Sequence, residues 1–396
     1  MELGRTHRPA FLPILEKVQK IGAEIVRPAA AEVDRDARFP HEAIAALRRE
    51  RLLSAAIPEV YGGMGLTIDE IAQICTALGQ NCSAAAMVYA MHKIQVASIV
   101  NFGQSSPYFK QLLVEMCEKQ TLIASVTSEV GVGGDMRSSI CAVESDAATG
   151  RFKVEKKASV ISYGEHADAL LLTARRSPES PPNDQVSVYL PMGDVKLERT
   201  GVWNTLGMRG TCSPSFVVKA EGAVEQVLPF PFADVAAQSM VPYSHITWSS
   251  LWLGIATDAV TRAHAFVRAD ARKRPGTLPF GGQRLAEASN KLQAMRSVIT
   301  DAIHFYSDAI GTADSADVLS GVGCAIRWNN LKISASQMVV EIVREAMAIC
   351  GMAGYSNDGK FSMGRQLRDA YSAQLMIAND RIHTTNANLM LVYKDD

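Results

Sequence analysis

The chain has 396 residues, of which 47% are apolar and 20% are charged, with 40 Lys and Arg against 41 Asp and Glu. This composition is that of a soluble globular protein, and the net charge of −1 gives no basic surplus for nucleic acid. At about 150 residues per domain, the length predicts two or three domains. The seven cysteines are scattered and form no CxxC pair, which favours free thiols in a reducing cytoplasm.

Two stretches bear on secretion and membranes. The opening MELGRTHRPAFL has no apolar core of the kind that a secretory signal needs. Residues 238–257 contain no Asp, Glu, Lys or Arg, but they carry Gln, His, Pro and several Ser and Thr. That mixture predicts a buried helix rather than a membrane span. We therefore expect a cytoplasmic protein without a membrane span.

Residues 1–120 have the pattern of helices. AEIVRPAAAEVDRD and HEAIAALRRERLL place apolar residues three and four apart, which is the helical period. Thr67 and Glu70 form a T-x-x-E capping box at the start of IDEIAQICTAL. The run NCSAAAMVYAMHKIQVASIV is rich in small residues and nearly all apolar, and it predicts a buried helix.

The pattern changes at about residue 121 to short runs of β-branched and aliphatic residues. Five strands are expected in LIASVTSE, FKVEKKASVISYG, ADALLLTAR, QVSVYLP and SFVVKAE. Turn residues such as SPESPPND separate them, at the spacing of a sandwich or barrel. We expect this β domain to end near residue 235.

From about residue 236 the helical period returns and persists. Four long helices are expected, at 240–271, 283–313, 317–350 and 364–391, and such helices pack as an antiparallel bundle. The predicted fold class is therefore α+β. It has three domains, which are an N-terminal helical domain (1–120), a middle β-barrel or sandwich domain (121–235) and a C-terminal four-helix bundle (236–396).

Several stretches, taken in order, resemble motifs of the acyl-CoA dehydrogenase superfamily, and the resemblance runs over nearly the whole chain. They are IPEVYGGMGLTIDE (57–70) for P-x-x-Y-G-G-x-G-L, SVTSEVGVGGD (125–135) for the flavin loop T-E-x-x-x-G-S-D, LGMRGT (206–211) for L-G-x-R-G-[ST], WLGIATDAVTRAHAFVRADARKR (252–274) for a bundle helix with a basic end, and CGMAGY (350–355) with LRDA (367–370) for G-G-x-G-[YF] and R-D-A.

The resemblance implies an FAD enzyme, usually a tetramer, that desaturates acyl thioesters between Cα and Cβ. A base removes the α proton while the β hydride passes to flavin N5, so the base must be a desolvated carboxylate with a raised pKa. The implied partners are an acyl thioester of CoA or of an acyl carrier protein, an electron-acceptor flavoprotein, and further copies of the chain in a dimer or tetramer. The eight histidines form no HxxxH or HxxEH pair, so no metal site is expected.

The resemblance also places candidate FAD-binding residues in the β domain. The end of the first strand would meet the edge of the isoalloxazine ring through Val126, Thr127 and Ser128. Gly133 and Gly134 would let the loop approach the flavin pyrophosphate closely, although an ordinary glycine-rich turn is the alternative. Further candidates lie in VISYG (160–164), where Ser162 keeps a hydroxyl for flavin N5 and Val160 stands in place of the usual covering Trp.

Other FAD-binding candidates lie in the C-terminal helices. The stretch ARKRPGTLPFGGQ (271–283) would reach the FAD of a neighbouring subunit, through Arg272 or Arg274 with Phe280 and Gln283. A basic helix end also occurs simply because cations offset the helix dipole. Gly351 and Asn379 are the last two candidate FAD-binding residues.

A proton acceptor is missing from both places where the resemblance puts it. Counting nine residues on from Arg368 gives Ile377, and counting ten back from Gly254 gives Ser244. Three substitutes are available, namely Asp380 just past the first slot, His245 beside the second, and His92 at the end of AMVYAMH. Histidine can serve as a base near neutral pH. A surface acid and two hydrogen-bonded core histidines are the structural alternatives.

The sequence leaves three functions open. The first is an FAD-dependent dehydrogenase that desaturates an acyl thioester with a non-standard base. The second is a flavin-dependent monooxygenase on the same fold, which needs no such base and takes reduced flavin from a partner reductase. The third is a non-catalytic partner subunit of a hetero-oligomeric dehydrogenase.

Overall fold

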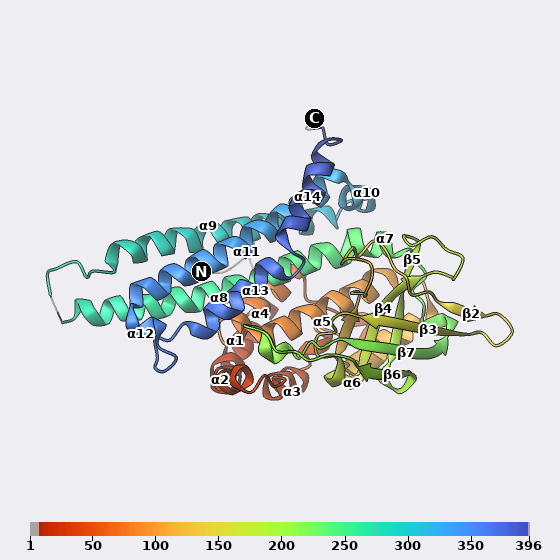
Figure 1. The fold of residues 1–396 in the computed structure, drawn as a ribbon, viewed down its shortest axis with the longest axis horizontal. Helices are drawn as coiled ribbons and strands as arrows, with labels where there is room; N and C mark the ends of the chain where they lie inside the picture. The colour runs from red at the N-terminus through yellow and green to blue at the C-terminus, as the bar shows by residue number, and fades with distance from the viewer. Residues whose placement is uncertain (1–7, 274, 395–396) are drawn as a thin grey trace.

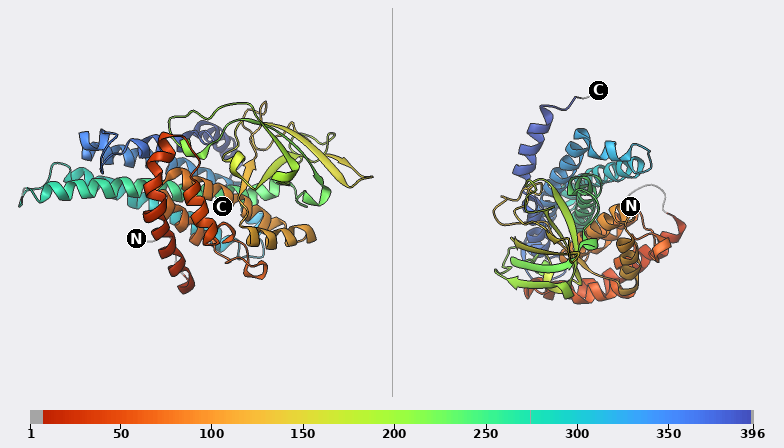
Figure 2. Two further views of the ribbon diagram at one scale, coloured as in Figure 1. Left: turned by 90° about the horizontal axis from the view of Figure 1, so that it is seen from below. Right: turned by 90° about the vertical axis from the view of Figure 1, so that its right-hand side faces the viewer.

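The computed structural model describes residues 8–273 and 275–394. Helices occupy both ends of the chain and strands its middle, and the strands gather beside one end of the long C-terminal helices (Figure 1). Seen from below, the first N-terminal helices run across the direction of the long C-terminal helices (Figure 2). The predicted α+β fold class is confirmed.

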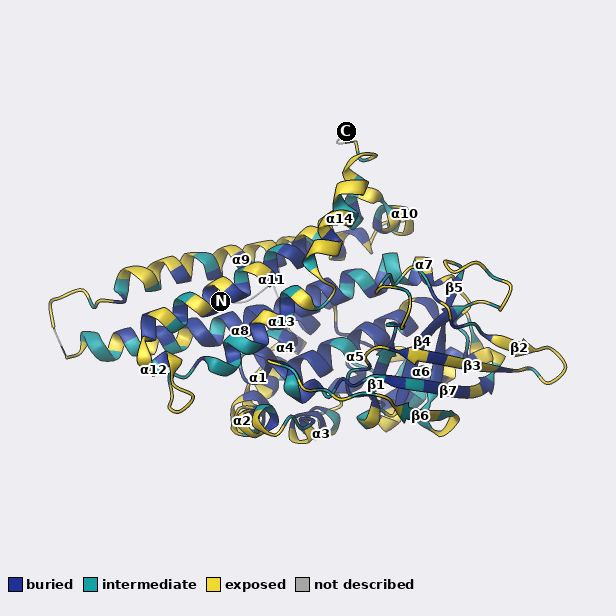
Figure 3. Ribbon diagram, in the orientation of Figure 1, coloured by how far each residue is buried: buried dark blue, intermediate teal, exposed yellow. Residues whose placement is uncertain are grey.

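The N-terminal segment forms helices where the apolar period predicts them. The predicted capping box is present, since Glu70 Oε2 accepts the Thr67 N–H at 2.9 Å. The small-residue run becomes a helix that is buried along almost its whole length (Figure 3). The helices are α1 (Leu12–Ile21), α2 (Arg27–Arg35), α3 (His41–Arg49), α4 (Ile68–Gly79), α5 (Ser83–Phe102) and α6 (Pro107–Lys119).

The middle of the chain forms two sheets, in the strand orders β1-β4-β5 and β2-β3-β7-β6. Strands β1 and β4 pair in parallel, and the other neighbours pair antiparallel. The strand expected through residue 164 ends at Ala158, because Tyr163 adopts a left-handed φ of 45° and residues 160–164 form a turn. The strands are β1 (Ile123–Val126), β2 (Glu144–Asp146), β3 (Arg151–Ala158), β4 (Ala169–Arg175), β5 (Gln185–Pro191), β6 (Val195–Arg199) and β7 (Phe216–Ala223).

The C-terminal segment forms the long helices α8 (Val241–Ala271), α9 (Gly282–Ala309) and α11 (Val322–Cys350). The expected single helix over 364–391 is wrong. It is divided into α13 (Gly364–Leu375) and α14 (Asn379–Met390), because Ile377 has a left-handed φ of 51°. Helix α14 therefore points away from the bundle (Figure 1).

Helix α8 is the centre of the molecule. It packs against α4 and α5 on one side and against α9 and α11 on the other. The stretch 238–257 is mostly buried, and Trp252 is fully so. In the described part of the chain, no helix is long and apolar enough to cross a membrane.

Candidate active site

A cavity of about 730 Å³ lies between α5, the loops of the β region, α8 and the turn that joins α13 to α14. Its volume is within the roughly 300–1,000 Å³ typical of small-molecule and cofactor sites. Flexible thioether side chains, which adapt to irregular ligands, form much of the wall, namely Met87, Met91, Met136, Met208, Met240 and Met376. The predicted site residues on this wall are Thr127, Ser128, Gly134, Ser162, His245 and Ile377.

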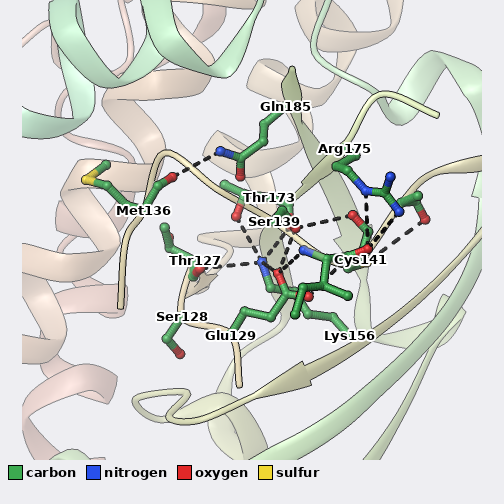
Figure 4. A network of polar contacts seen from close by, with 12 residues as sticks. Thr127, Ser128, Glu129, Met136, Ser139, Cys141, Lys156, Thr173, Arg175 and Gln185 are labelled. Atoms are coloured by element: carbon green, nitrogen blue, oxygen red, sulfur yellow. Dashed lines mark hydrogen bonds and ion pairs between the residues drawn. The ribbon is translucent and has the colours of Figure 1, made fainter. Parts of the chain in front are cut away.

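A buried ion pair holds the end of β1 (Figure 4). Glu129 and Lys156 lie 3.5 Å apart, and both are almost inaccessible to solvent. Glu129 also accepts hydrogen bonds from Ser139 Oγ and from the Cys141 N–H, each at 2.7 Å. Because both of its carboxylate oxygens are engaged, Glu129 does not offer a free base, although it lines the cavity. Its contacts fix residues 127–128 at the wall.

Hydroxyl groups form a row along the same wall. Ser213 Oγ donates to Ser162 Oγ at 2.9 Å and shares a hydrogen bond with Thr211 at 2.8 Å. Ser128 Oγ donates to the Val160 carbonyl at 2.7 Å and accepts the Val160 N–H at 3.2 Å. Hydroxyls both donate and accept, so this row can meet the mixed polar edge of a flat heterocycle.

The motifs LGMRGT and RDA form one contact. Asp369 is buried and accepts the Met208 N–H at 2.6 Å, and burial raises the pKa of this carboxyl. Arg368 makes a bidentate ion pair with Asp34 of α2. A Cβ at Gly207 would overlap the Arg368 backbone, so only glycine allows this approach. These residues shape the cavity wall.

The expected slot for the base lies in a strained turn. A left-handed conformation costs a β-branched residue such as Ile377 roughly 1–2 kcal/mol. Lys332 of α11 holds the turn, since its buried ammonium donates to the Ile377 carbonyl at 2.6 Å and to Asn379 Oδ1 at 2.7 Å. Burial lowers the pKa of Lys332 to about 7. Asn379 is thereby engaged in the turn and does not line the cavity.

His245 faces the cavity with one free ring nitrogen. Its Nδ1 lies 2.9 Å from the Val241 carbonyl, and a carbonyl only accepts, so Nδ1 carries the proton and Nε2 has a lone pair. In the described residues the ring's hydrogen bonds all involve Nδ1. Burial, reinforced by the charge of Lys332, lowers the pKa of His245 to about 4. The ring is therefore neutral at physiological pH and can accept a proton.

His92 lies behind the wall and not on it. Its Nδ1 accepts the Ile123 N–H at 3.1 Å, and its Nε2 lies 2.7 Å from the Leu53 carbonyl. Burial and the neighbouring Lys93 lower the pKa of His92 to about 3. With both nitrogens occupied, His92 joins α5 to β1 as a structural residue.

The depressed pKa of His92 predicts acid sensitivity. Between pH 6.5 and about 3 the unfolded chain binds a proton at this histidine that the folded chain does not, so stability falls as the pH falls. We expect His92 to remove about 2 kcal/mol between pH 7 and pH 5. Urea denaturation at the two pH values should show a smaller loss for His92→Gln. The exposed His383→Gln is the control and should keep the full loss.

The remaining predicted residues lie off the cavity wall. Asp380 is exposed in the first turn of α14, Val126 is buried, Gly133 has a φ of 61° in an exposed loop, and Gly351 ends α11. Arg272, Phe280 and Gln283 are exposed where α8 connects to α9, at the end of the bundle far from the strands (Figure 1). Phe280 is 94% exposed, which leaves it free to contact another subunit. Arg274 lies outside the described residues.

The cavity also contains residues that the sequence analysis did not nominate. Ser213 and Thr211 extend the hydroxyl row, and Trp203 adds an aromatic surface on the wall that Val160 shares. Arg381 of α14 joins the wall from the far end of the chain. Thr211 stands in the LGMRGT motif, which was a usable signal. Arg381 gave none, because the bend that brings it to the cavity depends on a bond from Lys332.

Two family models match the helical parts of the chain at its two ends. The model of the acyl-CoA dehydrogenase N-terminal domain matches residues 12–118, and that of the C-terminal domain matches residues 235–386. The chain belongs to the acyl-CoA dehydrogenase family. This acyl-CoA dehydrogenase family member is 24% identical to the cyclohex-1-ene-1-carbonyl-CoA dehydrogenase of Syntrophus aciditrophicus (strain SB), over 93% of this chain and 86% of that protein.

Solved structures with the same fold include those of KijD3 and TdsC. KijD3 in complex with dTDP has a TM-score of 0.84 at 19% identity, covering 98% of both chains. FMN-bound TdsC from Paenibacillus sp. A11-2 has a TM-score of 0.81 at 19% identity, covering 97% of this chain and 98% of TdsC. At these identities the likeness shows the fold of this acyl-CoA dehydrogenase family member.

The cofactor of the family is FAD, and the residues of this chain fit a flavin. The cavity is large enough for a cofactor, and its hydroxyl row is suited to a polar ring edge. Trp248 lines the cavity, and its indole Nε1 is buried without a hydrogen-bond partner among the residues that the structure describes. A buried donor without a partner is costly, so a ligand atom that accepts from it would be stabilised.

Proposed function

We propose that this chain is an FAD-dependent dehydrogenase that desaturates an acyl thioester, carried by CoA or by an acyl carrier protein, with His245 as the proton acceptor. The observation that carries the proposal is the unprotonated Nε2 of His245 on the wall that also bears the hydroxyl row. The relative from Syntrophus aciditrophicus, a dehydrogenase of a cyclic acyl-CoA, supports a thioester as the substrate class.

His245 would take the α proton on Nε2 while its Nδ1–H stays bonded to Val241, which fixes the ring orientation. Bound flavin supplies the acceptor for the β hydride. The methionine-lined wall would hold the acyl group and exclude water. A base with a pKa of about 4 is weaker than one matched to neutral pH, so we expect turnover to be slow.

We place the protein in the cytoplasm, as a dimer or tetramer that passes electrons to an acceptor flavoprotein. The exposed Arg272, Phe280 and Gln283 support assembly, because they do not line the cavity of their own chain. Sedimentation of the purified full chain tests the assembly, and a monomer would contradict it.

A flavin-dependent monooxygenase is the second candidate. It is favoured by the state of the two carboxylates on the wall, since Glu129 is engaged in its network and Asp135 pairs with Arg137 at 3.3 Å. The dibenzothiophene monooxygenase TdsC from Paenibacillus sp. A11-2 has the same fold. In this case a partner flavin reductase would supply reduced flavin.

Anaerobic titration of the FAD-loaded protein with acyl-CoAs separates these functions. Bleaching of the flavin band supports the dehydrogenase. Absence of bleaching, with an oxygen-dependent product when reduced flavin is supplied, supports the monooxygenase. A protein that binds FAD but does neither would be the non-catalytic partner subunit, and would overturn both proposals.

A further inference from the structure

Arg381 carries the uncompensated positive charge of the cavity wall. The other arginine on the wall, Arg368, is paired with Asp34. Among the described residues, Arg381 has no ion pair, and its guanidinium donates no hydrogen bond. The nearby Asp135 pairs with Arg137 instead. A planar guanidinium left free at a cavity is suited to an anion that it can bind through two hydrogen bonds.

Gly134 brings a backbone N–H donor to the same place. A Cβ on Gly134 would overlap the Arg381 guanidinium, so the side chain of Arg381 lies directly against this backbone. The resembled flavin loop has Ser at this position, and Arg381 occupies the space that such a side chain would need. The N–H group of Gly134, whose φ is 79°, makes no hydrogen bond among the described residues. Unpaired N–H groups in such a loop favour anions.

The position of Arg381 is fixed from outside the cavity. Lys332 bonds to the Ile377 carbonyl and to Asn379 Oδ1, and these bonds set the turn from which α14 leaves. Arg381 stands two residues beyond Asn379, in the first turn of α14. The bend therefore places the guanidinium over the glycine loop, whereas a continuous helix would carry this side chain elsewhere.

We propose that Arg381, together with the N–H group of Gly134, binds the phosphate on the ribityl chain of the flavin. The glycine loop follows the end of β1, where Thr127 and Ser128 line the same cavity, so one flavin can reach the hydroxyl row with its ring and Arg381 with its phosphate. FMN and FAD share this phosphate ester, and riboflavin lacks it. The inference rests on the family cofactor and not on the reaction.

Fluorescence titration of the full chain, stripped of flavin, with riboflavin, FMN and FAD tests the site. For Arg381→Ala we expect the Kd of FMN and of FAD to rise about tenfold to a hundredfold, which is the effect of losing a charge-assisted hydrogen bond. The Kd of riboflavin should change less than twofold. Arg381→Lys, which keeps the charge without the fork, should lie between the wild type and Arg381→Ala.

Arg151→Ala is the matched control, because Arg151 is an exposed arginine on β3 that does not line the cavity. All three flavins should bind it with unchanged Kd. Equal weakening of riboflavin by Arg381→Ala would overturn the proposal, since it would mean that the side chain supports the fold. Unchanged binding of FMN and FAD by Arg381→Ala would overturn the proposal too. A failed dehydrogenase assay would leave this result standing.

Discussion

Replacing His245 with alanine is expected to slow the reduction of bound FAD by an acyl-CoA about 10²–10⁴-fold, the contribution typical of a positioned general base. The reason is that His245 lines the cavity and keeps a lone pair on Nε2, because its Nδ1 carries the proton. Stopped-flow absorbance of the flavin band under anaerobic conditions measures the rate. The flavin spectrum and the Kd of FAD should not change, because among the described residues the His245 ring forms hydrogen bonds only within α8.

A rescue distinguishes lost base chemistry from lost structure. Ile377 already lines the cavity at the slot where the resemblance expects a carboxylate. The double variant His245→Ala with Ile377→Glu should therefore reduce its flavin at least about tenfold faster than His245→Ala alone, because a carboxylate in an apolar wall can act as a base. Thr261→Ala, exposed on α8 away from the cavity, should leave the rate unchanged. A loss of less than threefold on His245→Ala would contradict the assignment.

Removing the carboxylate of Glu129 is expected to give the largest loss of stability. Glu129→Ala leaves Lys156 buried without its charge partner and removes the acceptor of the Cys141 N–H. Breaking one side of a buried ion pair costs about 3–5 kcal/mol. Urea denaturation at pH 7 measures the free energy of unfolding. The same variant should bind FAD more weakly, because the network holds residues 127–128 at the wall.

The double variant Glu129→Ala with Lys156→Met separates the pair from its surroundings. Burial lowers the pKa of Lys156, so the ammonium is costly wherever its partner is missing. Lys156→Met should cost less than Glu129→Ala, since Glu129 keeps its bonds from Ser139 and Cys141. The double loss should be smaller than the sum of the two single losses. Strict additivity would show that the two side chains do not depend on each other.

Local signals in the sequence predicted most of the elements correctly. The capping box at Thr67 and Glu70, the buried helix α5 and the long helices α8, α9 and α11 all depend on residues within one or two turns of each other. The strand expected through 160–164 failed, because the left-handed Tyr163 turns the chain there, and its hydroxyl donates to the Ile123 carbonyl at 3.0 Å. That contact is forty residues distant and leaves no local trace.

The sequence by itself predicts that the standard base slot is empty, since the resemblance places that slot at Ile377 or at Ser244 and neither side chain is a carboxylate. It also determined the family, through motifs whose order and spacing are fixed along the chain. The tertiary structure decided which of the three candidate bases, Asp380, His245 and His92, could accept a proton at the cavity. In the folded chain both ring nitrogens of His92 form hydrogen bonds. His245 keeps the lone pair of its Nε2, because only its Nδ1 is engaged among the described residues, and Asp380 is exposed to solvent.

Only the tertiary structure could show that the stretch RDAYSAQLMIANDRI (368–382) is bent between α13 and α14 and does not form one continuous helix. The periodicity favoured a continuous helix, because helix propensity is local and the stretch contains no Gly or Pro. The bond from Lys332 to the Ile377 carbonyl joins residues 45 apart, and it offsets the strain of the left-handed isoleucine. The resulting bend brings Arg381 to Gly134.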